Sequence, residues 1–246
     1  MFLLSVETSS QLGSLAIIES TSSSGARVLA STQWSKSKSH SEVITVKLDE
    51  CLSKAGLELS GITHLAVGQG PGSFTGLRVG INLVRTLGYA NDLPVYSCSS
   101  LDVLARPAMV KFPDKPVLCL INAFRNLMYA SCYQSVDSTH STHKLVWGPE
   151  AITVKQLEER IKSSHTCVGN GYETFGNWLS APLKSWLDRD EGLEDTPSAT
   201  DLGLMAVDPQ LKNEFSSWKS IKPLYIRGSE AEEKLRSGLL KPIREI

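Results

Sequence analysis

Short apolar stretches separated by polar turns open the chain. Residues 2–6, 14–19 and 26–33 each have the length and the apolar content of a strand, and the turns between them are polar or contain glycine. Three such stretches in succession are typical of an antiparallel meander. The sequence therefore predicts that the chain begins with three neighbouring antiparallel strands.

Helical spacing follows these strands. Apolar residues recur every three or four positions from Ile44 to Ala55, which is the pattern of an amphipathic helix. Ser39-His40-Ser41-Glu42 stands before this pattern and fits a capping box, and Gly56 stands after it. We expect a helix between these two signals.

The rest of the first half alternates between strand and helix. The patterns predict a strand over 64–67, a helix over about 74–90, a strand over 94–97 and a short helix from Ser99. Three antiparallel strands followed by helix, strand, helix and strand differ from the strict alternation of a doubly wound sheet. The expected sheet is therefore mixed.

The second half repeats this order in reduced form. Its predicted elements are strands near 116–121, 127–133, 145–147 and 166–168 and a helix over 154–161. Pro107 and Pro113 punctuate the chain between the halves, so we predict two subdomains, residues 1–106 and residues 107–246, the second with a C-terminal tail. Residues 135–142 and 184–197 are polar or charged without periodicity and are predicted to be exposed loops.

Residues 67–80 form a glycine-rich segment between a predicted strand and a predicted helix. Its distinctive residues are Gly68, Gly70, Pro71, Gly72, Ser73, Gly76, Arg78 and Gly80. Glycines at such a junction indicate a sharp turn or a close approach to something else. Ser73 is predicted to cap the helix, whose first N–H groups offer an anion site. The alternative is a tight turn whose glycines only let two elements touch.

Known catalytic loops do not match this segment. A P-loop requires Lys-Ser or Lys-Thr after its last glycine, where this chain has Leu77-Arg78. The dinucleotide fingerprint fails because the third glycine, Gly72, comes one residue early. The nucleophile elbow fails because Pro71 and Thr75 stand at its glycine positions.

The glycine-rich segment resembles, nearly letter for letter, the signature of the TsaB (YeaZ) family, the accessory subunit of the bacterial tRNA threonylcarbamoyladenosine machinery. Further similar pieces are residues 6–10, 40–42, 121–125 with Met128-Tyr129, and 223–227. Two departures stand out. Glu7 replaces the usual Asp, and Asn122-Ala123-Phe124-Arg125 replaces the usual Asp-Ala-Arg.

The resemblance implies an actin-like ATPase (ribonuclease-H-like) α/β fold with two mixed-sheet subdomains. Glu7, Thr8, Ser9 and Ser10 then occupy the position of a degenerate first phosphate loop. The nearest match to a late adenosine-binding glycine pair is the isolated Gly169-Asn170-Gly171. We therefore expect no cofactor bound by this chain alone, and ATP or ADP at an interface with a partner is left open.

The resemblance also implies a lost metal site. The catalytic relative TsaD holds a metal with two histidines four residues apart, and Cys98 and Asp102 stand at those positions. One thiol and one carboxylate are too few ligands for a closed site. The five cysteines, without a C-x-x-C, favour small buried residues over a disulfide framework. His140 and His143 lie in a predicted loop, and His40 is expected to bond locally.

The helix over 74–90 is predicted to be a partner surface. Its only charged residues are Arg78 and Arg85, so most of its circumference is apolar. The resemblance implies that this helix and the helix before it meet a partner, and the partner-binding residues so predicted are Ile44, Leu48, Leu77, Gly80, Ile81, Leu83, Val84 and Leu87. The resemblance implies TsaD and TsaE as partners, tRNA contact only through the complex, and a homodimer in isolation. The alternative is that both apolar sides are buried within one domain.

Composition restricts the function further. The chain is 41% hydrophobic and 21% charged with a formal net charge of −1, so no global field attracts nucleic acid. The apolar run at residues 2–6 is too short for a signal or membrane segment, which makes the cytoplasm the expected location. We interpret the chain as a non-catalytic partner of TsaD. The alternatives are a stand-alone ATPase or glycoprotease-like hydrolase using Glu7, and a homodimeric adaptor without a tRNA role.

Overall fold

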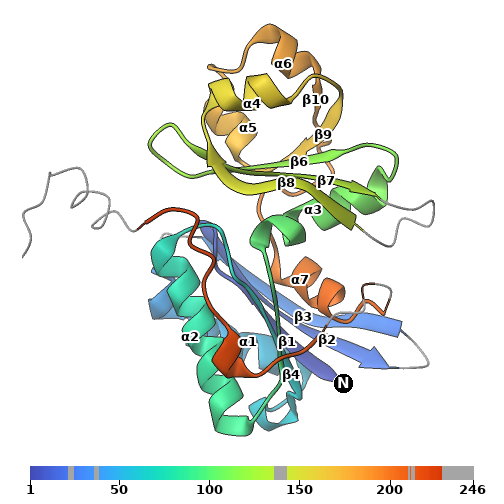
Figure 1. The fold of residues 1–246 in the computed structure, drawn as a ribbon. Coiled ribbons are helices and arrows are strands. Elements are labelled where there is room, and N and C mark those ends of the chain that lie inside the picture. Colours follow the sequence, from blue (N-terminus) through green and yellow to red (C-terminus); the bar gives the residue numbers. More distant parts are fainter. Residues whose placement is uncertain (22–24, 36–38, 136–142, 210, 212–213, 229–246) are drawn as a thin grey trace, which may run out of the picture.

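Two lobes, each built on a five-stranded mixed sheet, make up the computed structural model (Figure 1). It describes the chain except for residues 22–24, 36–38, 136–142, 210, 212–213 and 229–246. The strands of lobe I are β1 (Phe2–Glu7), β2 (Leu12–Thr21), β3 (Gly25–Ser35), β4 (His64–Gly68) and β5 (Val95–Cys98). The strands of lobe II are β6 (Val117–Asn122), β7 (Met128–Ser135), β8 (His143–Ile152), β9 (His165–Val168) and β10 (Leu187–Asp188).

Both sheets have the same topology. In lobe I the order is β3-β2-β1-β4-β5, with β1, β2 and β3 antiparallel and with β4 and β5 parallel to β1. In lobe II the order is β10-β9-β6-β7-β8, and the same three strands by position are antiparallel. This duplicated mixed sheet is the ribonuclease-H-like unit of the actin-like ATPase fold, so the predicted fold class is confirmed.

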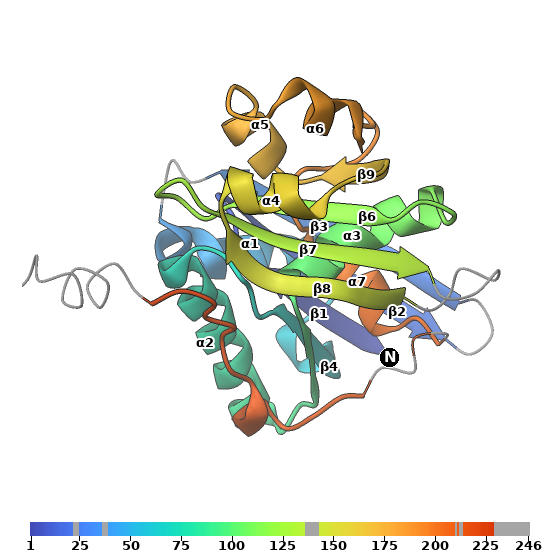
Figure 2. The same cartoon turned by 45° about the horizontal axis from the view of Figure 1, so that its top comes forward.

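Helices cover both faces of the lobe I sheet, and helices also pack on the lobe II sheet. The longer ones are α1 (His40–Ala55), α2 (Phe74–Asn91), α3 (Ser100–Lys111) and α7 (Ala199–Ala206), and the short ones are α4 (Val154–Arg160), α5 (Gly171–Phe175), α6 (Ala181–Ser185) and the 3-10 turns η1 (Leu59–Gly61) and η2 (Trp218–Ser220). α1 and α2 cover one face of the lobe I sheet, whereas α7 packs on the other (Figure 1). α3 packs on the lobe II sheet and against α7, so these two helices lie between the sheets (Figure 2).

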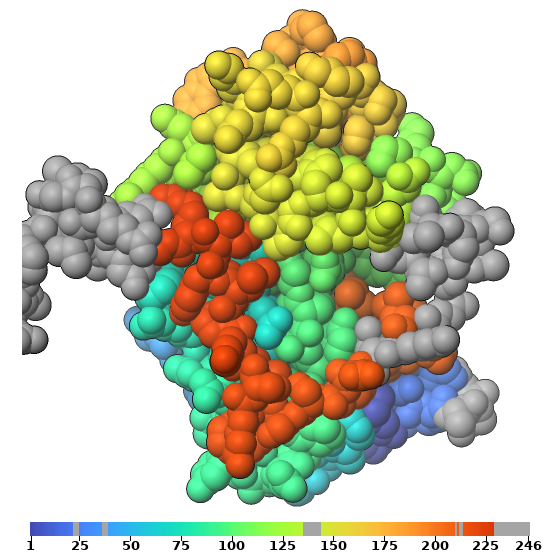
Figure 3. Space-filling model, in the orientation of Figure 1, coloured from blue at the N-terminus to red at the C-terminus, as the bar shows by residue number. Residues whose placement is uncertain are grey.

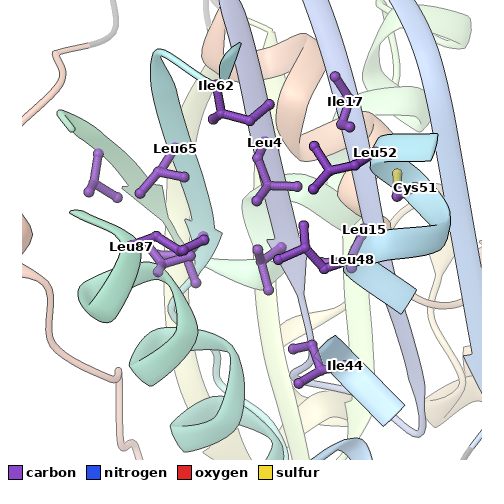
Figure 4. Close-up of a cluster of buried hydrophobic side chains, with 14 of the residues drawn as sticks. Leu4, Leu15, Ile17, Ile44, Leu48, Cys51, Leu52, Ile62, Leu65 and Leu87 are labelled. Atoms are coloured by element: carbon purple, nitrogen blue, oxygen red, sulfur yellow. The ribbon is translucent and has the colours of Figure 1, made fainter. Parts of the chain in front are cut away.

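The core of lobe I lies between its sheet and the helices α1 and α2. Leu4, Leu15 and Ile17 point from the strands toward Ile44, Leu48, Cys51 and Leu52 of α1 and Leu87 of α2 (Figure 4). All are buried. The helical spacing recognised in the sequence is therefore the spacing of side chains that face the sheet.

The ends of α1 differ in how well they follow the prediction. Gly56 adopts a left-handed φ of 67° and ends the helix as expected. The capping box at the other end is wrong, because Ser39 makes no side-chain cap. Its hydroxyl lies 2.6 Å from the Ser41 hydroxyl instead. A serine at the N-cap position of the sequence pattern does not ensure that its side chain adopts the rotamer that a cap requires.

The segment between the lobes is also helical where a break was expected. Pro107 lies inside α3, which runs to Lys111. The C-terminal residues do not all remain with lobe II, since α7 and Ile221 contribute to the lobe I core. Residues 184–197 contain β10 and the buried Leu187, so they are not simply an exposed loop. Of the loop predicted over 135–142, Ser135 ends β7, and residues 136–142, with His140, lie outside the described residues. His143 was placed in this loop, but it begins β8.

Candidate functional site

The loop after β1, residues 7–10, packs directly against the glycine-rich segment. The Ser73 N–H donates to the Ser9 carbonyl at 2.7 Å. The Thr8 hydroxyl donates to the Gly76 carbonyl at 2.8 Å. The Ser73 N–H and the Thr8 hydroxyl, two donors that could otherwise meet a phosphate, therefore already donate to carbonyl oxygens of this chain.

The glycines make this contact sterically feasible. A Cβ atom at Gly72 would lie 2.2 Å from the Ser9 carbonyl oxygen, and one at Gly76 would lie 2.2 Å from the Thr8 carbonyl oxygen. At Gly80 it would lie 2.3 Å from the Thr8 hydroxyl. No real Cβ tolerates such distances, so close backbone approach explains the glycine density.

The Glu7 side chain is buried beneath loop 7–10 and the glycine-rich segment. One carboxylate oxygen accepts the Ser9 N–H at 2.7 Å, and the other accepts the Ser100 hydroxyl at 2.9 Å. A Cβ at Gly68 would touch this carboxylate. Burial raises the pKa of Glu7, against the opposing effect of these hydrogen bonds. The Glu7 side chain thus connects β1 with α3 and packs against β4, and its carboxylate is not exposed to solvent.

The start of α2 follows the prediction in one respect. The Ser73 hydroxyl accepts the Gly76 N–H at 3.2 Å, so the predicted cap is confirmed. The Ser73 N–H, just before this turn, donates to the Ser9 carbonyl. The first turn of α2 therefore has fewer donors left for an anion than the sequence indicated.

A nucleotide phosphate does not fit the loop at residues 7–10. The hydroxyl of Ser9 is buried without a hydrogen-bond partner among the described residues, which by itself would favour a missing ligand. Yet a Cβ at Gly72 would lie 2.8 Å from the Ser9 Cβ, so the neighbouring backbone already fills the space beside this side chain.

A cleft of about 230 Å³ lies farther out, between the lobes. Residues 72–75 of lobe I line one side, residues 122–125 and Tyr129 of lobe II line the other, and Arg227 and Gly228 close it. Ser10 and Glu7 do not line it. The degenerate phosphate loop therefore lies behind residues 72 and 73 and does not itself line the cleft.

Asp102, which was aligned with a lost metal ligand, is hydrogen-bonded within the chain. Asp102 accepts the Tyr133 hydroxyl at 2.6 Å, and burial raises the pKa of its carboxyl. Burial also raises the pKa of the Cys98 thiol, whose residue is partly buried. Within the described part of the chain, no three His, Cys, Asp or Glu side chains are grouped as metal ligands.

The remaining predictions on single residues have mixed outcomes. Cys119, Cys132 and Cys167 are buried, as expected. His40 is not locally bonded: its ring accepts the Trp34 indole N–H at 3.0 Å and lies 3.1 Å from the Ser10 carbonyl. This long-range contact fixes loop 7–10 from the side of β3, and nothing in the local sequence indicates it.

Most of the predicted partner-binding residues face the interior. Seven of them are buried within the chain, namely Ile44, Leu48, Leu77, Gly80, Ile81, Val84 and Leu87. Figure 4 shows Ile44, Leu48 and Leu87 directed at the sheet. Leu83 alone among the eight is partly exposed. These seven residues are therefore buried by their own chain in this structure.

The C-terminal segment, residues 215–228, covers another side of α2 and was missed as a structural element. Trp218 packs over Gly88, where a Cβ would lie 2.8 Å from the Trp218 Cβ. The Leu224 N–H donates to the Gln69 carbonyl at 2.7 Å. Figure 3 shows this segment in red, crossing α2 and reaching lobe II. Its only signal in the sequence is the family-like run at residues 223–227.

Comparison with known proteins identifies the family. The model of the family described as TsaD, tRNA N6-adenosine threonylcarbamoyltransferase, matches residues 28–182. The chain belongs to this family. The tRNA threonylcarbamoyladenosine biosynthesis protein TsaB of Escherichia coli is 28% identical over 80% of this chain and 85% of its own length. TsaB of Haemophilus influenzae is 27% identical over 95% of this chain and 96% of its own length.

Solved structures agree with this family. A Pseudomonas aeruginosa protein with similarity to peptidase YeaZ has a TM-score of 0.73 and 25% identity, covering 92% of this chain and 99% of that protein. The resemblance to TsaB (YeaZ) proteins is therefore confirmed. In the described residues, no helix combines the length and the apolar character needed to cross a membrane.

Proposed function

We propose that the chain is a non-catalytic partner of the TsaD transferase in the formation of threonylcarbamoyladenosine in tRNA. Its relatives are named for this biosynthesis. The observation that carries the non-catalytic part is the contact between loop 7–10 and the glycine-rich segment, in which the chain's own backbone occupies the donors and acceptors. We expect the cytoplasm as the location, where tRNA is modified.

The partner surface we propose is the outer side of α1 and α2. Val46 of α1 is 56% exposed, and Leu83 and Val79 of α2 are partly exposed. The polar Thr86, three residues after Leu83 and on the same side of α2, is exposed. A mixed surface of this kind suits a non-obligate interface with an apolar centre and a polar rim. TsaD would bind here, the same surface would mediate a homodimer in isolation, and TsaE would join the assembled complex.

The competing function is an ATPase or hydrolase that uses Glu7. A general base must reach the proton that it abstracts, whereas the Glu7 carboxylate is enclosed and bonded to Ser9 and Ser100. Nucleotide bound by this chain alone is not expected, and ATP or ADP at the interface with TsaD is compatible with the proposal.

We therefore expect the purified chain to show no ATP turnover above background. The assay is phosphate release with and without Mg²⁺, run beside the Glu7→Gln variant as a matched control. Equal, background-level rates support the proposal. Turnover that is abolished by Glu7→Gln would establish the hydrolase instead.

A further inference from the structure

Three consecutive non-glycine residues adopt the left-handed conformation in the turn between β6 and β7. The φ angles are 59° for Phe124, 51° for Arg125 and 61° for Asn126. Such angles are uncommon for side-chain-bearing residues and are unfavourable. They persist where the surrounding structure fixes them, and they gather at functional sites.

The surroundings of this turn do fix it. The Phe124 N–H donates to the Asn122 side chain at 2.8 Å, and the Leu127 N–H donates to the Phe124 carbonyl at 3.1 Å. The Arg227 guanidinium donates to the carbonyls of Ala123 and Phe124, at 2.5 and 3.3 Å. The C-terminal segment thus holds the backbone of the turn in place, which sets the direction in which Phe124 and Arg125 leave the main chain.

The turn displays an aromatic ring at the rim of the interlobe cleft. The Phe124 side chain is 57% exposed, and Arg125 beside it is exposed. Across the cleft the Phe74 ring stacks on Tyr225, with centroids 4.8 Å apart. The Arg78 guanidinium lies 4.0 Å from the centroid of the Phe74 ring. An aromatic ring with a neighbouring guanidinium group therefore stands on each side of the cleft.

We call the β6–β7 turn (residues 123–126) and the facing residues 72–75 the corner. Its charge differs from that of the whole chain. The chain carries a formal net charge of −1. Among the described residues that line the cleft, Arg125 and Arg227 are present and Asp and Glu are absent. The hydroxyls of Ser73 and Thr75 add polar groups to the same lining. The charged groups among the described lining residues are therefore guanidinium groups, which suit an anionic ligand.

We propose that this corner binds an unpaired nucleotide of RNA. The base stacks on the exposed ring of Phe124, and the adjoining phosphate lies against Arg125 at the mouth of the cleft. Aromatic rings interleaved with cations are the means by which proteins hold unstacked bases. The choice of tRNA as the RNA rests on the proposed function, whereas the site itself rests on the geometry of the turn. The chain then contacts tRNA directly, in addition to any contact made by its partner.

The test measures binding of a fluorescently labelled RNA hairpin with an unpaired loop to the full chain at low salt. Phe124→Ala should weaken binding roughly 5- to 150-fold, the range expected for loss of one stacked base. Phe124→Leu keeps a large side chain at the same backbone position and should weaken binding similarly. Arg125→Gln should lower the slope of log affinity against log salt by about 0.7, as expected for one phosphate on a single strand.

Trp178→Ala is the matched control, because Trp178 is 59% exposed and lies outside the cleft lining. It should bind the hairpin like the unmodified chain, and a blunt duplex of the same stem should not compete. Unchanged affinity of Phe124→Ala and Arg125→Gln would overturn the proposal, even if the chain binds TsaD. Weaker binding of Phe124→Ala to TsaD without any change in RNA binding would also overturn it, since the ring would then be a protein contact. Loss of RNA binding by Phe124→Ala in a chain that does not bind TsaD would leave the site in place and refute the proposed function.

Discussion

Leu83→Glu should abolish association with TsaD while the chain remains folded. Leu83 is partly exposed on α2 and packs only partly into the lobe I core. An uncompensated charge in a desolvated contact costs about 3–5 kcal/mol, which weakens a complex more than a hundredfold. Isothermal titration measures the loss, and circular dichroism checks the fold.

Two further variants of α2 show whether weaker binding by Leu83→Glu comes from a lost contact, from unfolding or from added charge alone. Leu87 is only 9% exposed and faces the sheet, so Leu87→Glu should unfold the chain. Asn82 is exposed and should tolerate Glu with little change in either measurement. Normal affinity of a folded Leu83→Glu variant would place the partner surface elsewhere.

Gly76→Ala should destabilise the chain although alanine favours helices. The new Cβ would lie 2.2 Å from the Thr8 carbonyl oxygen, a backbone atom that cannot move without moving β1. Overpacking of this kind costs about 1–3 kcal/mol. Each kcal/mol lowers the Tm by about 2–4 °C in a chain of this size, so thermal unfolding should shift down by several degrees.

Gly61→Ala provides the control for this measurement. Its Cβ would lie 3.7 Å from the nearest atom outside its own neighbours, a Leu57 methyl group, which is an ordinary contact. Its Tm should therefore stay the same or rise slightly. An unchanged Tm for Gly76→Ala would mean that the loop and the glycine-rich segment separate readily.

The sequence was sufficient where local pattern and tertiary burial agree. The spacing of Ile44, Leu48 and Leu52 predicted α1 because the side that faces the sheet must be apolar. Ser73 was recognised as a cap because the cap bond is local. The duplicated strand order followed from two similar series of short apolar runs.

What the sequence could not provide is contact between distant segments. The bonds of His40 to Trp34 and Ser10 depend on how β3 meets loop 7–10. The cover of residues 215–228 over α2 depends on the return of the chain from lobe II. The apolar sides of α2 were assigned to a partner because a helix buried by its own chain and one buried by another have the same pattern.

The most direct test of the account is the amount of threonylcarbamoyladenosine that purified TsaD forms in tRNA, with TsaE, ATP and activated substrate supplied, in the presence and absence of this chain. We predict that modification requires the chain, that Glu7→Gln supports it, and that Leu83→Glu does not. Equal modification without the chain, or loss of modification with a folded Glu7→Gln variant that still binds TsaD, would contradict the assignment of a non-catalytic partner.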